Sequence, residues 1–217
     1  MVEEKLSEIR SELPATVKLL AVSKFQPCER LLEAYRAGQR LFGENRPQEL
    51  AAKAVQLPQD IEWHFIGHLQ TNKLKMVLPY AALVESIDSR HLLDAVEDWG
   101  AAHGKCISVL LEMHIGAEET KQGFYEEEVL DILFDAEKYR HIRFCGLMGM
   151  ASHTGDGEVV RADFTRIQAF FDYLKDLFPD LADFDELSIG MSDDWRIAVE
   201  CGSTQVRIGS AIFGPRV

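Results

Sequence analysis

The sequence is poor in basic residues and has no long apolar run, and each shortage excludes a class of protein. The 217 residues hold 23 Lys and Arg against 36 Asp and Glu, which gives a net charge of −13. Such a chain has no broad electrostatic attraction to nucleic acid or to an anionic membrane surface. No apolar run approaches the roughly 20 residues of a membrane span. We therefore expect neither nucleic acid nor membrane as a partner.

Cysteine is also scarce, and the spacing of the cysteines does not match a metal site. The four thiols lie far apart and form no Cys-x-x-Cys pair: Cys28, Cys106, Cys145 and Cys201. This spacing predicts neither a zinc site nor a disulfide framework and is typical of free thiols in a reducing compartment. The N-terminus, Met1–Lys5, is acidic and amphipathic and does not resemble a signal peptide. We expect a cytoplasmic protein without a bound metal.

Several catalytic signatures are missing as well. The sequence has no Gly-x-x-x-x-Gly-Lys loop, no Gly-x-Ser-x-Gly elbow and no His-Glu-x-x-His pair, so nucleotide hydrolysis, serine acyl transfer and zinc proteolysis have no support. His64 and His68 are four residues apart, but their segment is typical of a strand followed by a turn. They would not share a helix face as metal ligands would, and we expect them to line or brace the rim of a pocket.

Short apolar runs typical of strands alternate with helical patterns along the whole chain. Eight strands are predicted, over Val17–Ser23, Arg40–Gly43, Glu62–Ile66, Leu83–Ser86, Ile107–His114, Ile142–Gly146, Glu186–Ile189 and Gln205–Ile208. Helices are predicted over Glu29–Ala37, Pro47–Val55, Leu69–Val77, Ser89–Ala102, Tyr125–Tyr139, Glu158–Leu177 and Asp193–Cys201. Eight strands with helical crossovers favour an α/β fold of the (β/α)₈ TIM-barrel type, with an open doubly wound sheet as the alternative.

The two ends of the chain modify this expected barrel. The sequence stops soon after the eighth strand, which leaves no room for a full eighth helix. An extra helix over Val2–Leu13 is expected to cover that gap. No linker, low-complexity segment or repeat marks a second domain, so residues 1–217 are expected to form a single domain.

Two glycine-rich strand ends near the C-terminus predict a phosphate site. The first is Leu187–Ser192 and the second is Val206–Ser210. Glycine lets the backbone come close to a ligand, serine adds a hydroxyl donor, and amides at a following helix start favour an anion. In a (β/α)₈ barrel the loops after strands 7 and 8 commonly bind phosphate.

Lys24 ends the first predicted strand, where a barrel opens onto its C-terminal face. It is either a solvated loop lysine or an amine that forms an imine with a carbonyl ligand. Imine formation requires the neutral amine, and a reference pKa of about 10.4 leaves only about 1 in 2,500 molecules neutral at pH 7. Lowering that pKa by about three units requires roughly 4 kcal/mol of desolvation or neighbouring positive charge.

Two further residues, Arg207 and Asn45, have two interpretations each, and Lys121 has one. Strand alternation places Gln205, Arg207 and Gly209 on one face, so Arg207 points into the barrel, where it either pairs with a carboxylate or serves a ligand. Asn45, at the end of the second strand, is interpreted as a cap of the next helix in preference to a ligand donor. Lys121 lies in a charged loop after the fifth strand and is expected to be solvated.

These residues together suggest one ligand. Lys24 offers an amine, Arg207 offers a donor, and Ser192 with Gly209 and Ser210 offers a phosphate cradle. Pyridoxal 5′-phosphate (PLP) has an aldehyde, a ring nitrogen and a phosphate that match these three features.

The sequence resembles the YggS/PROSC family of pyridoxal phosphate homeostasis proteins. The resemblance is collinear from the first strand to the C-terminus and rests on Ala21–Lys24, Phe42–Asn45, Trp63–Lys73, Gly146–Met148, Ser188–Asp194 and Gly202–Gly214. Met113-His114 and Gly149-Met150 depart from the commoner residues of the family, which affects the detail of the pocket.

The resemblance implies a barrel like the N-terminal domain of alanine racemases, with PLP held as a Schiff base on Lys24. It implies that Ser192, Gly209 and Ser210 hold the phosphate, that Asn45 lies beside the cofactor and that Arg207 faces the ring nitrogen. Further candidates for cofactor contacts are His68, Met191 and Lys121.

The resemblance also implies a role in vitamin B6 homeostasis without established catalysis. Arginine does not lose its proton, so Arg207 would keep the ring nitrogen unprotonated and the ring a poor electron sink. The expected function is to carry PLP, as a monomer, and to hand it to apo-enzymes. The alternatives are a PLP-dependent amino-acid racemase or lyase and a Schiff-base aldolase, the last of which the resemblance disfavours.

Overall fold

The fold is a closed barrel of eight parallel strands in chain order, with β1 paired to β8. It is described here from a computed structural model, for residues 1–116 and 122–214. The strands are β1 (Lys18–Val22), β2 (Leu41–Glu44), β3 (Glu62–Phe65), β4 (Ala81–Ile87), β5 (Ile107–Met113), β6 (Ile142–Gly149), β7 (Glu186–Met191) and β8 (Gln205–Ile208). The predicted (β/α)₈ barrel is therefore confirmed, and the open doubly wound sheet is wrong.

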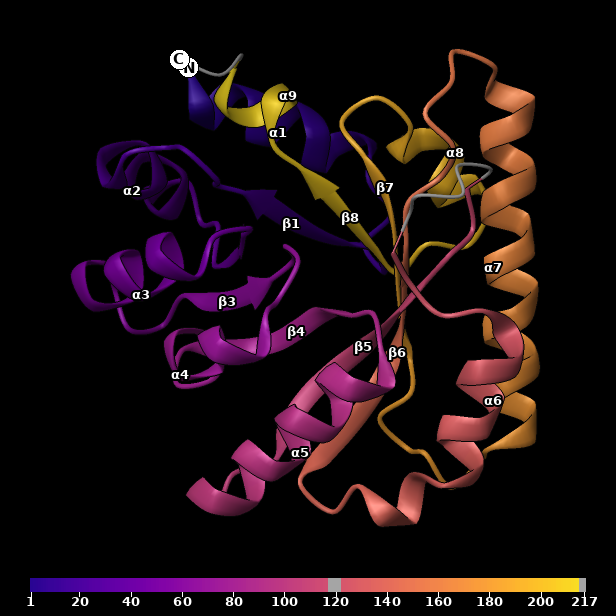
Figure 1. The fold of residues 1–217 in the computed structure, drawn as a ribbon. Coiled ribbons are helices and arrows are strands. Elements are labelled where there is room, and N and C mark those ends of the chain that lie inside the picture. The colour runs from indigo at the N-terminus through magenta and orange to yellow at the C-terminus, as the bar shows by residue number, and fades with distance from the viewer. Residues whose placement is uncertain (117–121, 215–217) are drawn as a thin grey trace.

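Helices surround the barrel on its outer face (Figure 1). They are α1 (Val2–Glu12), α2 (Cys28–Arg36), α3 (Pro47–Gln56), α4 (Leu74–Val77), α5 (Arg90–His103), α6 (Glu126–Phe134), α7 (Gly157–Leu177), α8 (Trp195–Glu200) and α9 (Ser210–Phe213), with 3₁₀ turns η1 (Thr71–Lys73) and η2 (Ala136–Lys138). Two predicted helices thus divide into an α-helix and a 3₁₀ turn, and the short α9 was not predicted. Among the described residues, no helix combines the length and the apolarity that crossing a bilayer requires.

Local sequence signals set several of these helix ends. Ser89 caps α5 by accepting a hydrogen bond from the Leu92 N–H, and Gly104 ends the same helix in the left-handed region at φ 60°. Pro47 occupies the first position of α3, where its missing N–H removes no helical hydrogen bond.

Side chains alternate between two environments along the strands. The outward aliphatic residues of β8, Val206 and Ile208, belong to the large core between barrel and helices. Leu83, Leu110 and Met148 form a separate small cluster, as expected for inward-facing positions of a parallel barrel. The barrel interior therefore combines a small apolar cluster with polar residues, which belong to the site described below.

The N-terminal helix closes the side of the barrel that lacks a full eighth helix, as predicted. Helix α1 packs against α2 and against the short α9 (Figure 1), and buries Val2, Leu6 and Ile9. At its end, Arg10 donates a hydrogen bond of 2.7 Å to the Ala37 carbonyl. An ion pair of 2.6 Å joins Glu12 to Arg196 of α8.

A close contact between the neighbouring strands β6 and β7 provides a test of the packing of the barrel wall. A Cβ atom added to Gly146 of β6, at φ +144°, would lie 1.8 Å from the Glu186 carbonyl oxygen of β7. We expect Gly146→Ala to lower the free energy of unfolding by roughly 3 kcal/mol because the two strands must separate. The matched control is Gly155→Ala at an exposed loop position with open space around it, for which we expect a change within about 0.5 kcal/mol. Urea unfolding of both variants measures the difference, and equal stabilities would contradict this account of the barrel wall.

Candidate functional site

The pairing of β1 with β8 brings the two ends of the chain to the same end of the barrel. The register runs from Lys18 opposite Gln205 to Ala21 opposite Ile208. Just beyond it, Gly209 lies against Val22, since a Cβ atom on Gly209 would be 3.2 Å from the Val22 Cβ and carbonyl oxygen. Lys24 follows two residues later and is half-buried. The structure therefore places Gly209 and the turn that carries Lys24 at the same end of the barrel, its C-terminal mouth.

The two glycine-rich strand ends also meet. The Gly209 N–H donates a hydrogen bond of 3.3 Å to the Ser192 Oγ, which joins the loop after β7 to the loop after β8. Gly190, at φ +93°, is required because a Cβ atom there would lie 2.5 Å from the Ala198 Cβ of α8. Ser192, Gly209 and the exposed Ser210 thus form one small-residue surface. Met191, which is 40% exposed, stands at its edge.

Asn45 does not cap the following helix, so that sequence interpretation is wrong. The N-cap of α3 is Arg46, and no side chain caps that helix. The backbone of Asn45 is instead packed against Gly67, where an added Cβ would lie 2.1 Å from the Asn45 carbonyl oxygen. The Asn45 Oδ1 atom is buried and has no hydrogen-bond partner among the described residues.

Arg207 points into the barrel, as strand alternation predicts. Its Nη1 donates to the Ser188 carbonyl at 2.6 Å and to the Ser188 Oγ at 2.8 Å, and its Nη2 donates to the Gly149 carbonyl at 2.8 Å. In the described chain no carboxylate pairs directly with this guanidinium, so the alternative of a structural ion pair is wrong. Burial lowers the pKa of Arg207, while the charges of Glu85 and Glu112 oppose that shift.

A buried carboxylate, Glu85 of β4, organises the polar interior. Its two oxygens contact His64 Nδ1 at 2.6 Å, Gln205 Nε2 at 2.8 Å and Ser188 Oγ at 2.6 Å. Burial alone would raise the pKa of Glu85, but the contacts with His64 and the charge of Arg207 hold it below its ordinary value. Since Ser188 also contacts Arg207, the network links β3, β4, β7 and β8 and fixes the guanidinium.

The two histidines take different positions. His64 is buried in the network, whereas His68 is half-exposed at the rim and contacts Asp88 Oδ2 at 3.0 Å through Nδ1. The expectation that both line or brace the rim of a pocket stays a prediction. No group of three His, Cys, Asp or Glu side chains within the described chain is placed to hold a metal ion. Lys121 lies outside the described residues.

Sequence reasoning missed a second buried polar cluster, below the Lys24 turn. Lys53 of α3 is buried and bonds to Glu44 Oε1 at 2.7 Å, to Glu49 Oε2 at 2.9 Å and to the Ser23 carbonyl at 2.9 Å. The available signal was the spacing of Glu49 and Lys53, four residues apart on a helix. That spacing is common on solvated helices and does not reveal burial.

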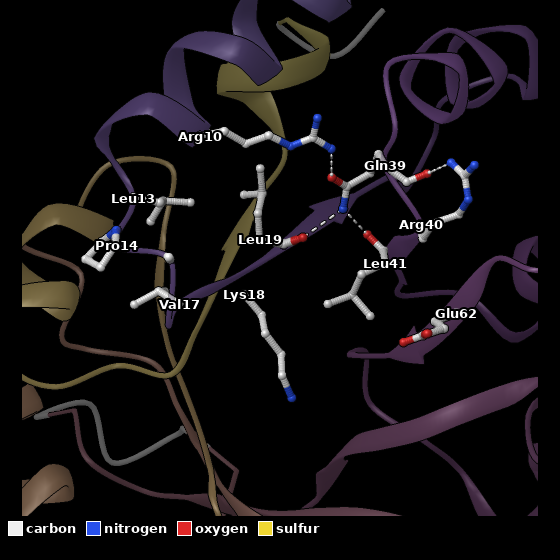
Figure 2. A pocket seen from close by; sticks show the side chains of 11 residues that line it. Arg10, Leu13, Pro14, Val17, Lys18, Leu19, Gln39, Arg40, Leu41 and Glu62 are labelled. Atoms are coloured by element: carbon white, nitrogen blue, oxygen red, sulfur yellow. Dashed lines mark hydrogen bonds between the residues drawn. The ribbon is translucent and has the colours of Figure 1, made fainter.

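The cavity shown in Figure 2 lies at the opposite end of the barrel. It has a volume of about 410 Å³ and is lined by α1 and by residues near the N-terminal ends of β1, β2 and β3. Its cations have partners, because Arg10 donates to Gln39, Lys18 pairs with Glu186 and Arg40 pairs with Asp60. This cavity is separate from the mouth that holds Lys24.

Comparison with known proteins agrees with this geometry. The family profile of the alanine racemase N-terminal domain matches residues 1–217. A pyridoxal phosphate homeostasis protein of Pasteurella multocida is 37% identical, with 99% of this chain and 97% of that protein covered. The human pyridoxal phosphate homeostasis protein is 39% identical, with 99% and 82% covered. The chain belongs to the pyridoxal phosphate homeostasis protein family.

A solved structure of this homeostasis family shares the whole fold. PipY of Synechococcus elongatus is 34% identical, with 99% of this chain and 100% of that chain covered. The TM-score is 0.93 to PipY without PLP and 0.91 to PipY with PLP bound.

Glu112 provides a test of the interior electrostatics. Burial, with the charge of Asp88, raises its pKa from 4.5 to about 7, and Arg207 only partly opposes this. Because the folded state retains a proton that the unfolded state releases between these values, stability falls as pH rises from about 4.5 to 7.

We therefore expect Glu112→Gln to be more stable than the parent by about 3 kcal/mol at pH 8 and nearly equal to it at pH 4.5. Urea unfolding of both proteins at the two pH values measures this. A difference that is the same at both would show that Glu112 titrates normally.

Proposed function

We propose that this chain binds PLP at the C-terminal mouth of the barrel, attached to Lys24, and thereby takes part in PLP homeostasis. The observation that carries the proposal is the closure of the barrel by β1 and β8. It brings the end of β1, which leads into Lys24, against Gly209, and Gly209 is bonded to Ser192. This supports one ligand that reaches both an amine and a small-residue phosphate cradle. The family membership supports the same ligand.

The residues at the mouth fit the three parts of PLP. Gly209 lacks the Cβ that would crowd Val22, and its loop with Ser192 and Ser210 offers amide and hydroxyl donors for a phosphate. The Asn45 Oδ1 has no hydrogen-bond partner among the described residues, which supports a polar contact between this amide and the cofactor. Arg207 is a cation of the barrel interior on β8, two residues before Gly209, and we assign it to the ring nitrogen.

When bound, PLP supplies an aldehyde that condenses with the Lys24 amine, so that a C=N bond replaces C=O and water leaves. The chain's own residues then determine the chemistry at the ring nitrogen. Arg207 is held by two carbonyl oxygens and a hydroxyl and keeps its proton, so it presents only donors to a ring nitrogen. This favours holding PLP over the electron withdrawal that racemisation requires.

The recipients of the cofactor can be inferred from this function. A carrier that holds PLP through a reversible link can return it to PLP-dependent apo-enzymes, which we propose as its partners. All four cysteines are free thiols, which is typical of proteins in a reducing compartment and supports a cytoplasmic location.

Chemical trapping tests the attachment site. Borohydride reduction of the protein with PLP should fix a pyridoxyl group on Lys24, because reduction converts the C=N bond into a stable amine. Lys24→Ala should show no fixation and no imine absorbance, while the phosphate cradle retains weaker binding.

Lys75→Ala, at an exposed lysine of α4, is the matched control and should be labelled like the parent. Peptide mass spectrometry locates the label. Unchanged imine absorbance in Lys24→Ala would contradict the assignment.

A further inference from the structure

The turn that carries Lys24 has an unusual backbone. The Gln26 N–H donates to the Ser23 carbonyl at 3.0 Å, which defines a four-residue turn from Ser23 to Gln26. Phe25, at φ 63°, is the only non-glycine residue with a positive φ in the described chain. Phenylalanine has no side-chain acceptor or donor to favour this region, as asparagine has. Contacts from outside the turn must therefore stabilise it.

Two of those contacts come from one helix, α3. Glu49 Oε2 accepts a hydrogen bond of 2.9 Å from the Phe25 N–H, and Lys53 Nζ donates one of 2.9 Å to the Ser23 carbonyl. Glu49 and Lys53 are one helical turn apart and also bond to each other at 2.9 Å. The two peptide groups that α3 contacts lie on either side of Lys24.

Lys53 is buried where it contacts the turn, and burial of its charge costs free energy. It is 6% exposed, and its three bonds use all three ammonium donors. Its third partner, Glu44 Oε1, also accepts a hydrogen bond of 2.6 Å from the Ser23 hydroxyl. Burial is the main influence that raises the pKa of Glu44. A buried ion pair is seldom more stable than apolar residues of similar volume, so stability alone does not explain a lysine here.

We propose that Lys53 is a positioning residue for cofactor attachment. Together with Glu49 it fixes the Ser23–Gln26 turn, so that the Lys24 amine is presented to the PLP aldehyde across from Gly209. Lys53 itself touches neither the cofactor nor Lys24 in this assignment. The inference rests on the proposed function, because it presumes that Lys24 is the attachment residue.

The test separates attachment from binding by using two ligands. PLP can attach to Lys24, whereas pyridoxamine 5′-phosphate has the same ring and phosphate but no aldehyde. In Glu49→Ala and in the double variant Lys53→Met/Glu44→Gln, which avoids an unpaired buried carboxylate, the rate constant of imine formation should fall roughly tenfold or more. The dissociation constant of pyridoxamine 5′-phosphate should change by less than about threefold. Stopped-flow absorbance gives the rate, and calorimetry gives the dissociation constant.

Two controls make the outcome decisive. Leu93→Ala removes a fully buried side chain of α5, lowers stability and should leave the attachment rate unchanged. Hydrogen exchange in the Ser23–Gln26 segment should accelerate in the Glu49 variant and not in Leu93→Ala.

Three results would overturn the inference: parental attachment rates in a folded variant, equal loss of both ligands, or the same slowing in Leu93→Ala. If the double variant does not fold, Glu49→Ala decides alone, because Glu49 is only partly buried. A parent protein that takes up neither ligand refutes the proposed function itself. If the parent protein attaches PLP normally and the variants attach it at the same rate, only the role of Lys53 is refuted.

Discussion

The pairing of β1 with β8 is the constraint on which the candidate site depends. It converts a chain with Lys24 near its start and Gly209 near its end into a closed ring whose first and last strand ends are neighbours. The register matters as much as the closure. A slip of one residue in β8 would turn Arg207 toward the helices and Val206 into the barrel, because strand side chains alternate between faces. Closure and register together determine which side chains share the mouth.

The polar interior explains how a cation is retained inside a barrel. Arg207 has no direct carboxylate partner among the described residues, yet Glu85 stands behind it through Ser188. Glu85 is in turn held by His64 and Gln205. The positive charge of Arg207 is therefore balanced through a hydrogen-bond network across four strands and not through one direct ion pair. An arrangement of this kind fixes the guanidinium in place through carbonyl and hydroxyl acceptors. Glu112 is also buried in the interior, and burial together with the charge of Asp88 raises its pKa to about 7.

The sequence was sufficient for the fold and for the inward direction of Arg207, because both depend on periodicity. Strand bounds differ mainly where residues at the barrel mouth, such as Met148 and Gly149 of β6 and Met191 of β7, continue the ladder past a glycine. The functions of Asn45 and Lys53 could not be read in this way. The cap assigned to Asn45 is locally reasonable, but its backbone is held by Gly67 from another strand end. The burial of Lys53 likewise depends on Glu44 and Ser23, which lie 9 and 30 residues before it outside its own helix, and no local pattern predicts such a contact.

The composition of the mouth has a consequence for release. The phosphate cradle that we propose consists of Ser192, Gly209 and Ser210, which are neutral donors, and two aspartates, Asp193 and Asp194, follow Ser192 directly. Asp194 accepts the Met191 N–H at 2.5 Å and so places a carboxylate beside the cradle. Hydrogen bonds from neutral groups to an anion are weaker than those from arginine or lysine, and nearby negative charge opposes a dianion. Much of the affinity then has to come from the link to Lys24. That link can be reversed by water or by a competing amine, so a carrier built in this way holds PLP firmly only while the bond to Lys24 remains.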